Sequence, residues 1–189
     1  MEYLAKSVAD DIRSKKWVGA VGYMGILLRS YQIPRDFSID TKSDDAIKSI
    51  YTVLDTLNKA IAPYIKYIRD NRNDPDIAAT IGGDPVIERL LMSKTPTIDD
   101  EAHNEGTNPR PDEHGVLEDP EAVKARAKYQ VALLYLEFIL VIIVRFLLPG
   151  RIEFPDTMGG GRRRRKQKRV KTAKRRGVVR RRQSTRRRV

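Results

Sequence analysis

A regular pattern of apolar residues between positions 47 and 68 constrains the fold more than any other feature of this chain. Steps of three and four separate these apolar positions, which are Ile47, Ile50, Leu54, Leu57, Ile61, Tyr64 and Ile68. A 3.5-residue period of this length is typical of an α-helix that packs lengthwise against other helices. Ser43-Asp44-Asp45 provides a capping hydroxyl and two acids for a first turn. We therefore predict one helix over residues 43–71, kinked at Pro63.

A second long helix is predicted over residues 119–148. Asp119-Pro120-Glu121 is a strong helix start, and Pro149-Gly150 ends the pattern. Residues 131–148 are apolar except for Glu137 and Arg145, which fits either a helix covered by protein on all sides or a membrane span. The charged first part of the same helix favours the protein core, and the span is kept as the alternative.

Two shorter helices are predicted before these, over residues 2–16 and 17–31, from apolar residues at helical spacing. Within the second, Gly19, Gly22 and Gly25 recur every third residue. Glycine has no side chain beyond its hydrogen, so this stripe predicts a helix face on which another backbone packs closely.

An acidic segment separates the two long helices. Residues 73–118 contain 11 acidic and three basic side chains and five of the ten prolines. We predict an acidic loop or insertion there, with one short helix that starts at Asp84-Pro85. His103 and His114 lie in this segment without the close spacing of metal ligands.

The sequence shows no pattern typical of catalysis. It contains no cysteine, and we find no Gly-rich nucleotide loop, nucleophile elbow or metalloprotease motif. We expect a protein that is not an enzyme, with no catalytic residue, no metal and no cofactor.

The formal net charge of +12 divides into two parts of opposite sign. Residues 162–189 hold 17 basic side chains and no acid, whereas residues 1–161 hold 20 basic and 25 acidic ones. A segment of this composition cannot bury a core, so we expect a disordered tail that binds the phosphates of RNA or DNA without sequence preference. The predicted nucleic-acid-binding residues are Arg162, Arg163, Arg164, Arg165, Lys166, Lys168, Arg169, Lys171, Lys174, Arg175, Arg176, Arg180, Arg181, Arg182, Arg186, Arg187 and Arg188.

Two hydroxyl residues in the tail are candidate phosphorylation sites. Thr172 and Ser184 each follow an arginine by three residues, a spacing that suits basophilic kinases. A phosphate would weaken the attraction between tail and nucleic acid. Kinases and nuclear-import receptors, for which residues 162–169 could serve as a signal, are therefore further candidate partners.

These elements predict an all-α protein. Residues 1–150 would form a helical assembly domain, 151–161 a linker and 162–189 the tail. The two long helices would form an antiparallel hairpin with the acidic loop at its tip, and two hairpins would pair as a four-helix-bundle homodimer. We expect the dimer interface to comprise the seven periodic residues given above together with Leu134, Phe138 and Val141.

The order of these parts resembles that of the core (capsid) proteins of hepadnaviruses and of their fish relatives, the nackednaviruses. The matching features are the paired long helices, the apolar stretch Tyr135–Leu148 before Pro149 and Phe154-Pro155, and the linker to Arg162. The resemblance implies a capsid protein whose dimers assemble into a shell around nucleic acid, found in the virion and in the host cytoplasm or nucleus. It also implies contacts between dimers, made by Pro149, Arg151, Phe154 and Pro155.

Two other functions share parts of this pattern. A cellular, chromatin-like condenser would dimerise and compact nucleic acid without forming closed particles. A membrane protein would span the bilayer with residues 131–148 and keep the basic tail in the cytoplasm. We expect no membrane partner, because the upstream half of that helix is charged.

Overall fold

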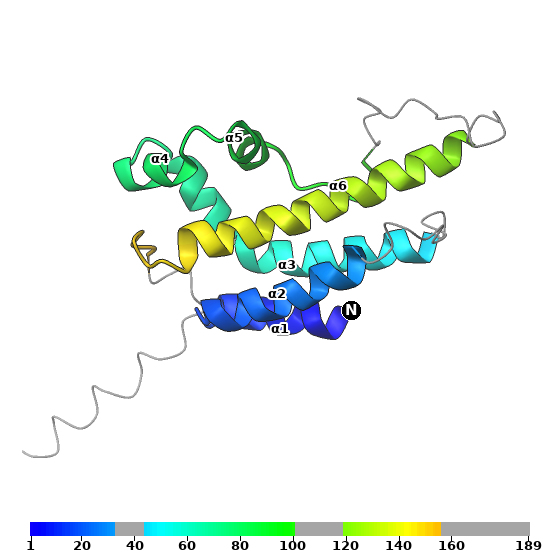
Figure 1. Ribbon diagram of the computed structural model, residues 1–189, viewed down its shortest axis with the longest axis horizontal. Helices are drawn as coiled ribbons and strands as arrows, with labels where there is room; N and C mark the ends of the chain where they lie inside the picture. Colours follow the sequence, from blue (N-terminus) through cyan, green and yellow to red (C-terminus); the bar gives the residue numbers. More distant parts are fainter. Residues whose placement is uncertain (33–43, 101–118, 156–189) are drawn as a thin grey trace, which may run out of the picture. The chain divides into compact units, whose positions relative to one another are not determined.

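Six α-helices and one π-helical turn make up the part of the chain that the computed structural model describes, which comprises residues 1–32, 44–100 and 119–155. The described residues contain no strand, so the predicted all-α class is confirmed. In chain order the helical segments are α1 (Glu2–Arg13), α2 (Trp17–Gln32), α3 (Asp44–Asp70), α4 (Pro75–Ile81), α5 (Pro85–Met92), α6 (Pro120–Ile142) and the π turn η2 (Ile143–Leu147) (Figure 1).

The two long helices lie where the sequence predicts them. Pro63 is inside α3, and Figure 1 shows the last turns of this helix bending away from the first part. At the start of α6 the Asp119 carboxylate accepts a hydrogen bond from the backbone N–H of Glu121 at 3.1 Å. The helix widens at its other end, where the N–H of Leu148 donates to the carbonyl of Ile143 at 2.8 Å.

Two short helices, α4 and α5, lie in the segment that the sequence predicts as an acidic loop. Each begins with the same arrangement, in which an aspartate precedes a proline and its side chain accepts hydrogen bonds from the next backbone N–H groups. Helix α5 is the one predicted from Asp84-Pro85, whereas α4, which Asp74 caps, is not predicted. Residues 101–118 of the acidic segment lie outside the described residues.

Four helices pack around one core within a single chain. Helix α1 contacts α2 and α3, and α6 contacts α3 and α2, so the four close into a ring (Figure 1). Trp17, the first residue of α2, meets Tyr64 of α3 edge-on, with 5.5 Å between the centroids of the two side-chain rings. A four-helix arrangement is therefore complete without a second copy.

Helices α3 and α6 run in the same direction, so the predicted antiparallel hairpin is wrong. Near the start of both helices the Tyr51 hydroxyl donates to the carbonyl of Lys128 at 3.2 Å. In the last turn of α3 the Tyr67 hydroxyl donates to the carbonyl of Glu153, which follows the end of α6, at 3.4 Å. Residue numbers thus rise together along the pair, as Figure 1 also shows.

The chain between the two helices explains this direction. After α5, residues 93–100 return along α6 in the opposite sense to that helix. The Tyr135 hydroxyl donates to the carbonyl of Lys94 at 2.7 Å, and the ammonium of Lys128 donates to the carbonyl of Ile98 at 2.8 Å. Because the connection comes back before α6 begins, α6 starts beside the start of α3.

The residues predicted for the dimer interface mostly belong to the core of one chain. The seven periodic residues of α3 are at most 6% exposed, and Phe138 is 3% exposed. Val141 is partly buried against the same core, and Leu134 is exposed. The heptad pattern therefore describes packing of α3 on the other helices of its own chain, and a dimer built on it would first have to open this core.

One helical stretch is long and apolar enough to cross a membrane by length and composition. It comprises Pro120–Leu147, and half of its most apolar 18-residue window is buried inside the protein. Both charged side chains of its apolar part are engaged with neighbouring segments. Glu137 accepts a hydrogen bond from Gln32 at 2.7 Å, and Arg145 lies 3.4 Å from Asp84.

Candidate functional site

The predicted nucleic-acid-binding residues of the tail lie outside the described residues, as do Thr172 and Ser184. The described residues all belong to one compact unit, Met1–Gly159, which ends in the glycine run that directly precedes Arg162. The described residues that come closest to the tail in sequence are those of the first part of the linker, at 151–155.

The linker is fastened to α3 by aromatic packing. The ring of Phe154 lies 5.3 Å from that of Tyr64 and 5.2 Å from that of Tyr67, measured between centroids. Offset and edge-on pairs of this kind contribute about 0.5–1.5 kcal/mol each beyond the burial of their area. Together with Trp17 these side chains form a group of four rings, which we call the aromatic cluster. It anchors the chain only a few residues before the tail.

This packing bears on the residues that the family resemblance assigns to contacts between dimers. Phe154 is partly buried against its own chain, so it is engaged before any second copy arrives. Pro149, Arg151 and Pro155 are exposed, and their role between copies stays a prediction. Gly150 has a φ of +64°, a backbone conformation that favours glycine, and it turns the chain away from the π turn.

Burial shifts the acid–base behaviour of the cluster. Desolvation raises the pKa of Tyr64, because the phenolate is harder to hold in an apolar site than the phenol. The Tyr64 hydroxyl is fully buried and has no hydrogen-bond partner among the described residues. The cluster is thus an apolar anchor rather than a polar site.

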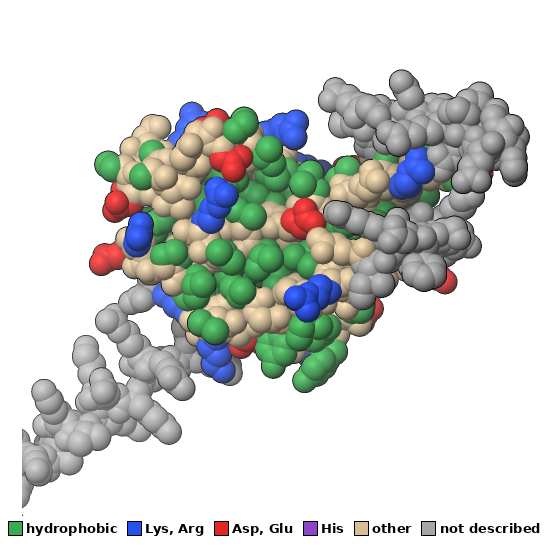
Figure 2. Space-filling view, viewed as in Figure 1, with side chains coloured by type: hydrophobic (Ala, Val, Ile, Leu, Met, Phe, Trp, Pro, Cys, Tyr) green, Lys and Arg blue, Asp and Glu red, His purple; other side chains and the backbone are tan. Residues whose placement is uncertain are grey.

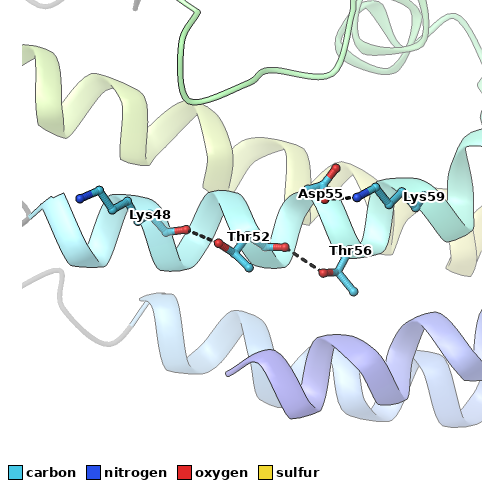
Figure 3. Close-up of polar contacts among 5 residues, drawn as sticks. All are labelled: Lys48, Thr52, Asp55, Thr56 and Lys59. Atoms are coloured by element: carbon cyan, nitrogen blue, oxygen red, sulfur yellow. Dashed lines mark hydrogen bonds and ion pairs between the residues drawn. The ribbon is translucent and has the colours of Figure 1, made fainter.

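The outward face of α3 is polar and satisfied by its own helix (Figure 3). The Thr52 hydroxyl donates to the carbonyl of Lys48 at 2.8 Å, and the Thr56 hydroxyl donates to that of Thr52 at 2.9 Å. Asp55 and Lys59 form an exposed ion pair. Such a polar face is well hydrated and offers no apolar surface to a second copy.

An open groove lies between this face of α3 and residues 94–98. Its volume is about 580 Å³, and both cations and an acid line it, namely Lys48, Lys94 and Asp55. The mixed charge does not select for an anion such as phosphate. Among the described residues no group of three or more histidine, aspartate or glutamate side chains could hold a metal ion.

The aromatic cluster is the part of this region that the sequence does not predict as a unit. Its members come from α2, from the end of α3 and from the linker, so they are far apart along the chain. The signals are weak ones: the only tryptophan of the chain and the Phe154-Pro155 pair after a helix end.

Comparisons of this chain with family models, with curated proteins and with solved structures found no match. The resemblance to hepadnavirus core proteins therefore rests on the order of parts in the sequence alone. The parallel α3 and α6 remove one of those parts, the antiparallel hairpin.

Proposed function

We propose that this protein packages nucleic acid, with the tail as the binding segment and the helical body as the part that associates with further copies. The observation that carries the proposal is the separation of charge. Residues 162–189 hold 17 cations and no acid, whereas the rest of the chain is net acidic. A polyanion with many evenly spaced charges is the partner that such a segment suits best.

The proposed mechanism is release of counterions from phosphates. On a single strand, each phosphate contact makes the slope of log K against log salt concentration more negative by about 0.7. Seventeen contacts would therefore give a slope of about −12. Arginines outnumber lysines in the tail, and the guanidinium binds phosphate oxygens in pairs. No aromatic residue is present in the tail to stack on bases. We therefore expect tight, salt-sensitive binding without sequence preference.

Packaging in a closed shell, as a viral capsid protein, is the specific form that we propose. Support for it comes from the joining of a helical body to a tail of this charge in one short chain. A chromatin-like condenser would use the same tail chemistry, and only the assembled product separates the two. The burial of half of the apolar window of α6 favours a protein core over a membrane span.

A salt titration with matched variants tests the role of the tail. Binding of the full chain to a fluorescent single-stranded RNA is measured from 0.1 to about 1 M salt. Changing Arg162, Arg163, Arg164, Arg165 and Lys166 to glutamine should reduce the slope by about 3–4. The control changes five lysines of the body to glutamine, namely Lys6, Lys59, Lys66, Lys94 and Lys124. Equal slopes for the two variants would contradict the assignment of the tail.

Electron microscopy of the purified full chain tests the shell. With added RNA we expect closed particles of uniform size, and a chain that ends at Gly161 should lose the bound RNA. Coated or compacted RNA without closed particles would favour the condenser. A protein that stays monomeric and forms no particle with or without RNA would contradict packaging altogether.

A further inference from the structure

One apolar face of the helical body is left exposed in the part of the chain that the structure describes. On α2, the side chain of Val18 is 77% exposed and that of Ile26 is 53% exposed. On the neighbouring end of α6 and η2, Val144 and Leu148 are about 40% exposed, at 40% and 39%. Figure 2 shows hydrophobic side chains gathered on the side where α2 and α6 face the viewer. Contiguous apolar surface of this kind marks sites of association in soluble proteins.

Packing within the described part of the chain does not explain two glycines of this face. A Cβ atom added to Gly22 or Gly25 would meet nothing within 4 Å, whereas one at Gly19 would come within 2.3 Å of the Asp11 carboxylate. Packing of α1 thus explains Gly19 and does not explain the other two. Each glycine inside a helix costs about 0.8–1.0 kcal/mol relative to alanine. Gly22 and Gly25 instead leave room for a backbone that approaches from outside.

The exposed residues are arranged symmetrically about Gly22. Val18 and Ile26 lie four residues before and after it, so each is one turn from it on the same face. When two copies of α2 cross in opposite directions at Gly22, Val18 of one copy meets Ile26 of the other. That is the self-complementary pattern that a two-fold interface requires.

The charges of the face do not favour any other occupant. Glu137 is held by Gln32 at 2.7 Å and Arg145 lies 3.4 Å from Asp84, so both are engaged within the chain. Nucleic acid would need clustered cations, and the basic tail would need clustered acids. Arg29 is exposed on the same face, two turns after Gly22, and a single cation of this kind is not such a cluster. When two copies of α2 cross in opposite directions at Gly22, their Arg29 side chains lie at opposite ends of the contact, so no like charges meet at its centre.

We propose that a second copy of this chain covers this face in a two-fold dimer centred on Gly22 of α2. The interface includes Val18 and Ile26, with Val144 and Leu148 of α6 and η2 at its side. This proposal deepens the packaging function and rests on it for the expectation that copies associate. This interface takes the place of the one predicted from the sequence, whose α3 residues are buried in a single chain, and it uses residues that are exposed there.

Sedimentation equilibrium of the full chain, freed of nucleic acid by nuclease and 1 M salt, tests the interface. Ile26→Lys should weaken dimerisation by about a hundredfold or more, because a two-fold interface contains each substitution twice. The control is Val86→Lys on α5, which makes the same change at a residue of similar exposure, 45%, and should leave the dimer unchanged. Gly22→Ala separates association from folding, since it should raise the melting temperature of the chain while weakening the dimer.

A cross-link tests the geometry. The chain has no cysteine, so Gly22→Cys introduces a single thiol. On a two-fold axis it should form a disulfide between copies under mild oxidation, and Val86→Cys should not. A dimer unaffected by Ile26→Lys, or Gly22→Cys that does not cross-link, would overturn the interface. If the chain is monomeric and co-floats with neutral lipid vesicles in a density gradient, the dimer interface is wrong and the apolar face binds lipid.

A different result would contradict the packaging function. Full chain that does not bind RNA in the salt titration would contradict packaging, while the cross-link at Gly22 could still form. Conversely, RNA packaging that survives alongside a dimer insensitive to Ile26→Lys would leave packaging intact and remove only this interface.

Discussion

The buried hydroxyl of Tyr64 allows a sharp test of the core around the linker. Tyr64 is 1% exposed, and its ring is held between those of Trp17 and Phe154. Within the part of the chain that the structure describes, its hydroxyl has no hydrogen-bond partner. In the unfolded chain water would satisfy this group, so folding costs its hydration without a replacement. Tyr64→Phe removes the hydroxyl and keeps the ring, and we expect it to stabilise the protein.

The size of the effect follows from the cost of an unsatisfied buried polar group, which is about 1–3 kcal/mol. We expect Tyr64→Phe to recover about 1–2 kcal/mol, since the ring contacts with Trp17 and Phe154 are unchanged. For a chain of this size one kcal/mol corresponds to about 2–4 °C in melting temperature.

Tyr135→Phe is the matched control. Its hydroxyl contacts the Ser93 hydroxyl at 2.6 Å and the carbonyl of Lys94 at 2.7 Å. Removing it should cost about 1–2 kcal/mol, so the same chemical change has opposite signs at the two positions. Urea unfolding at pH 7 and high salt, followed by circular dichroism, measures both. If Tyr64→Phe destabilises the protein as much as Tyr135→Phe does, the Tyr64 hydroxyl has a partner and the reasoning is refuted.

Three further predictions concern stability. Burial raises the pKa of Tyr31, Tyr51 and Tyr129 above the ordinary value of 10.0, so the folded chain retains protons that the unfolded chain loses. The free energy of unfolding should therefore stay constant in this respect below about pH 10 and fall above it. Urea unfolding between pH 8 and 11 measures this fall. Asp84→Ala removes the cap of α5, in which the Asp84 carboxylate accepts from the backbone N–H groups of Val86 and Ile87 at 3.1 and 3.3 Å. It should lower the free energy of unfolding by about 1–2 kcal/mol. Asp84→Asn keeps a capping oxygen and should lower it less. Phe154→Ala removes two ring contacts and should speed proteolysis in the linker several-fold without changing the helix content; an unchanged cleavage rate would mean that the linker is not anchored there.

Local signals in the sequence predict most of the helices. The apolar period places both ends of α3 within one residue, and Asp119-Pro120 places the start of α6 within one residue. The predicted end at 148 lies six residues past the end of α6, because the π turn Ile143–Leu147 continues the helical path. Helix α5 follows from Asp84-Pro85 in the same way. Helix α4 begins at Asp74-Pro75 with the same chemistry, but it is only seven residues long. A helix of this length has too few apolar residues to show a periodic pattern within the acidic segment. Caps and periodicity are properties of a few neighbouring residues, so they can be read from the sequence.

The direction of α6 and the partners of α3 cannot be read in this way. A heptad pattern shows that a helix face is covered and does not say by what. Here α1 and α6 of the same chain cover it, because residues 93–100 lie back along α6 and reverse the expected direction. The glycines of α2 show the same limit. Their spacing predicts close packing, which the chain itself provides at Gly19 and leaves open at Gly22.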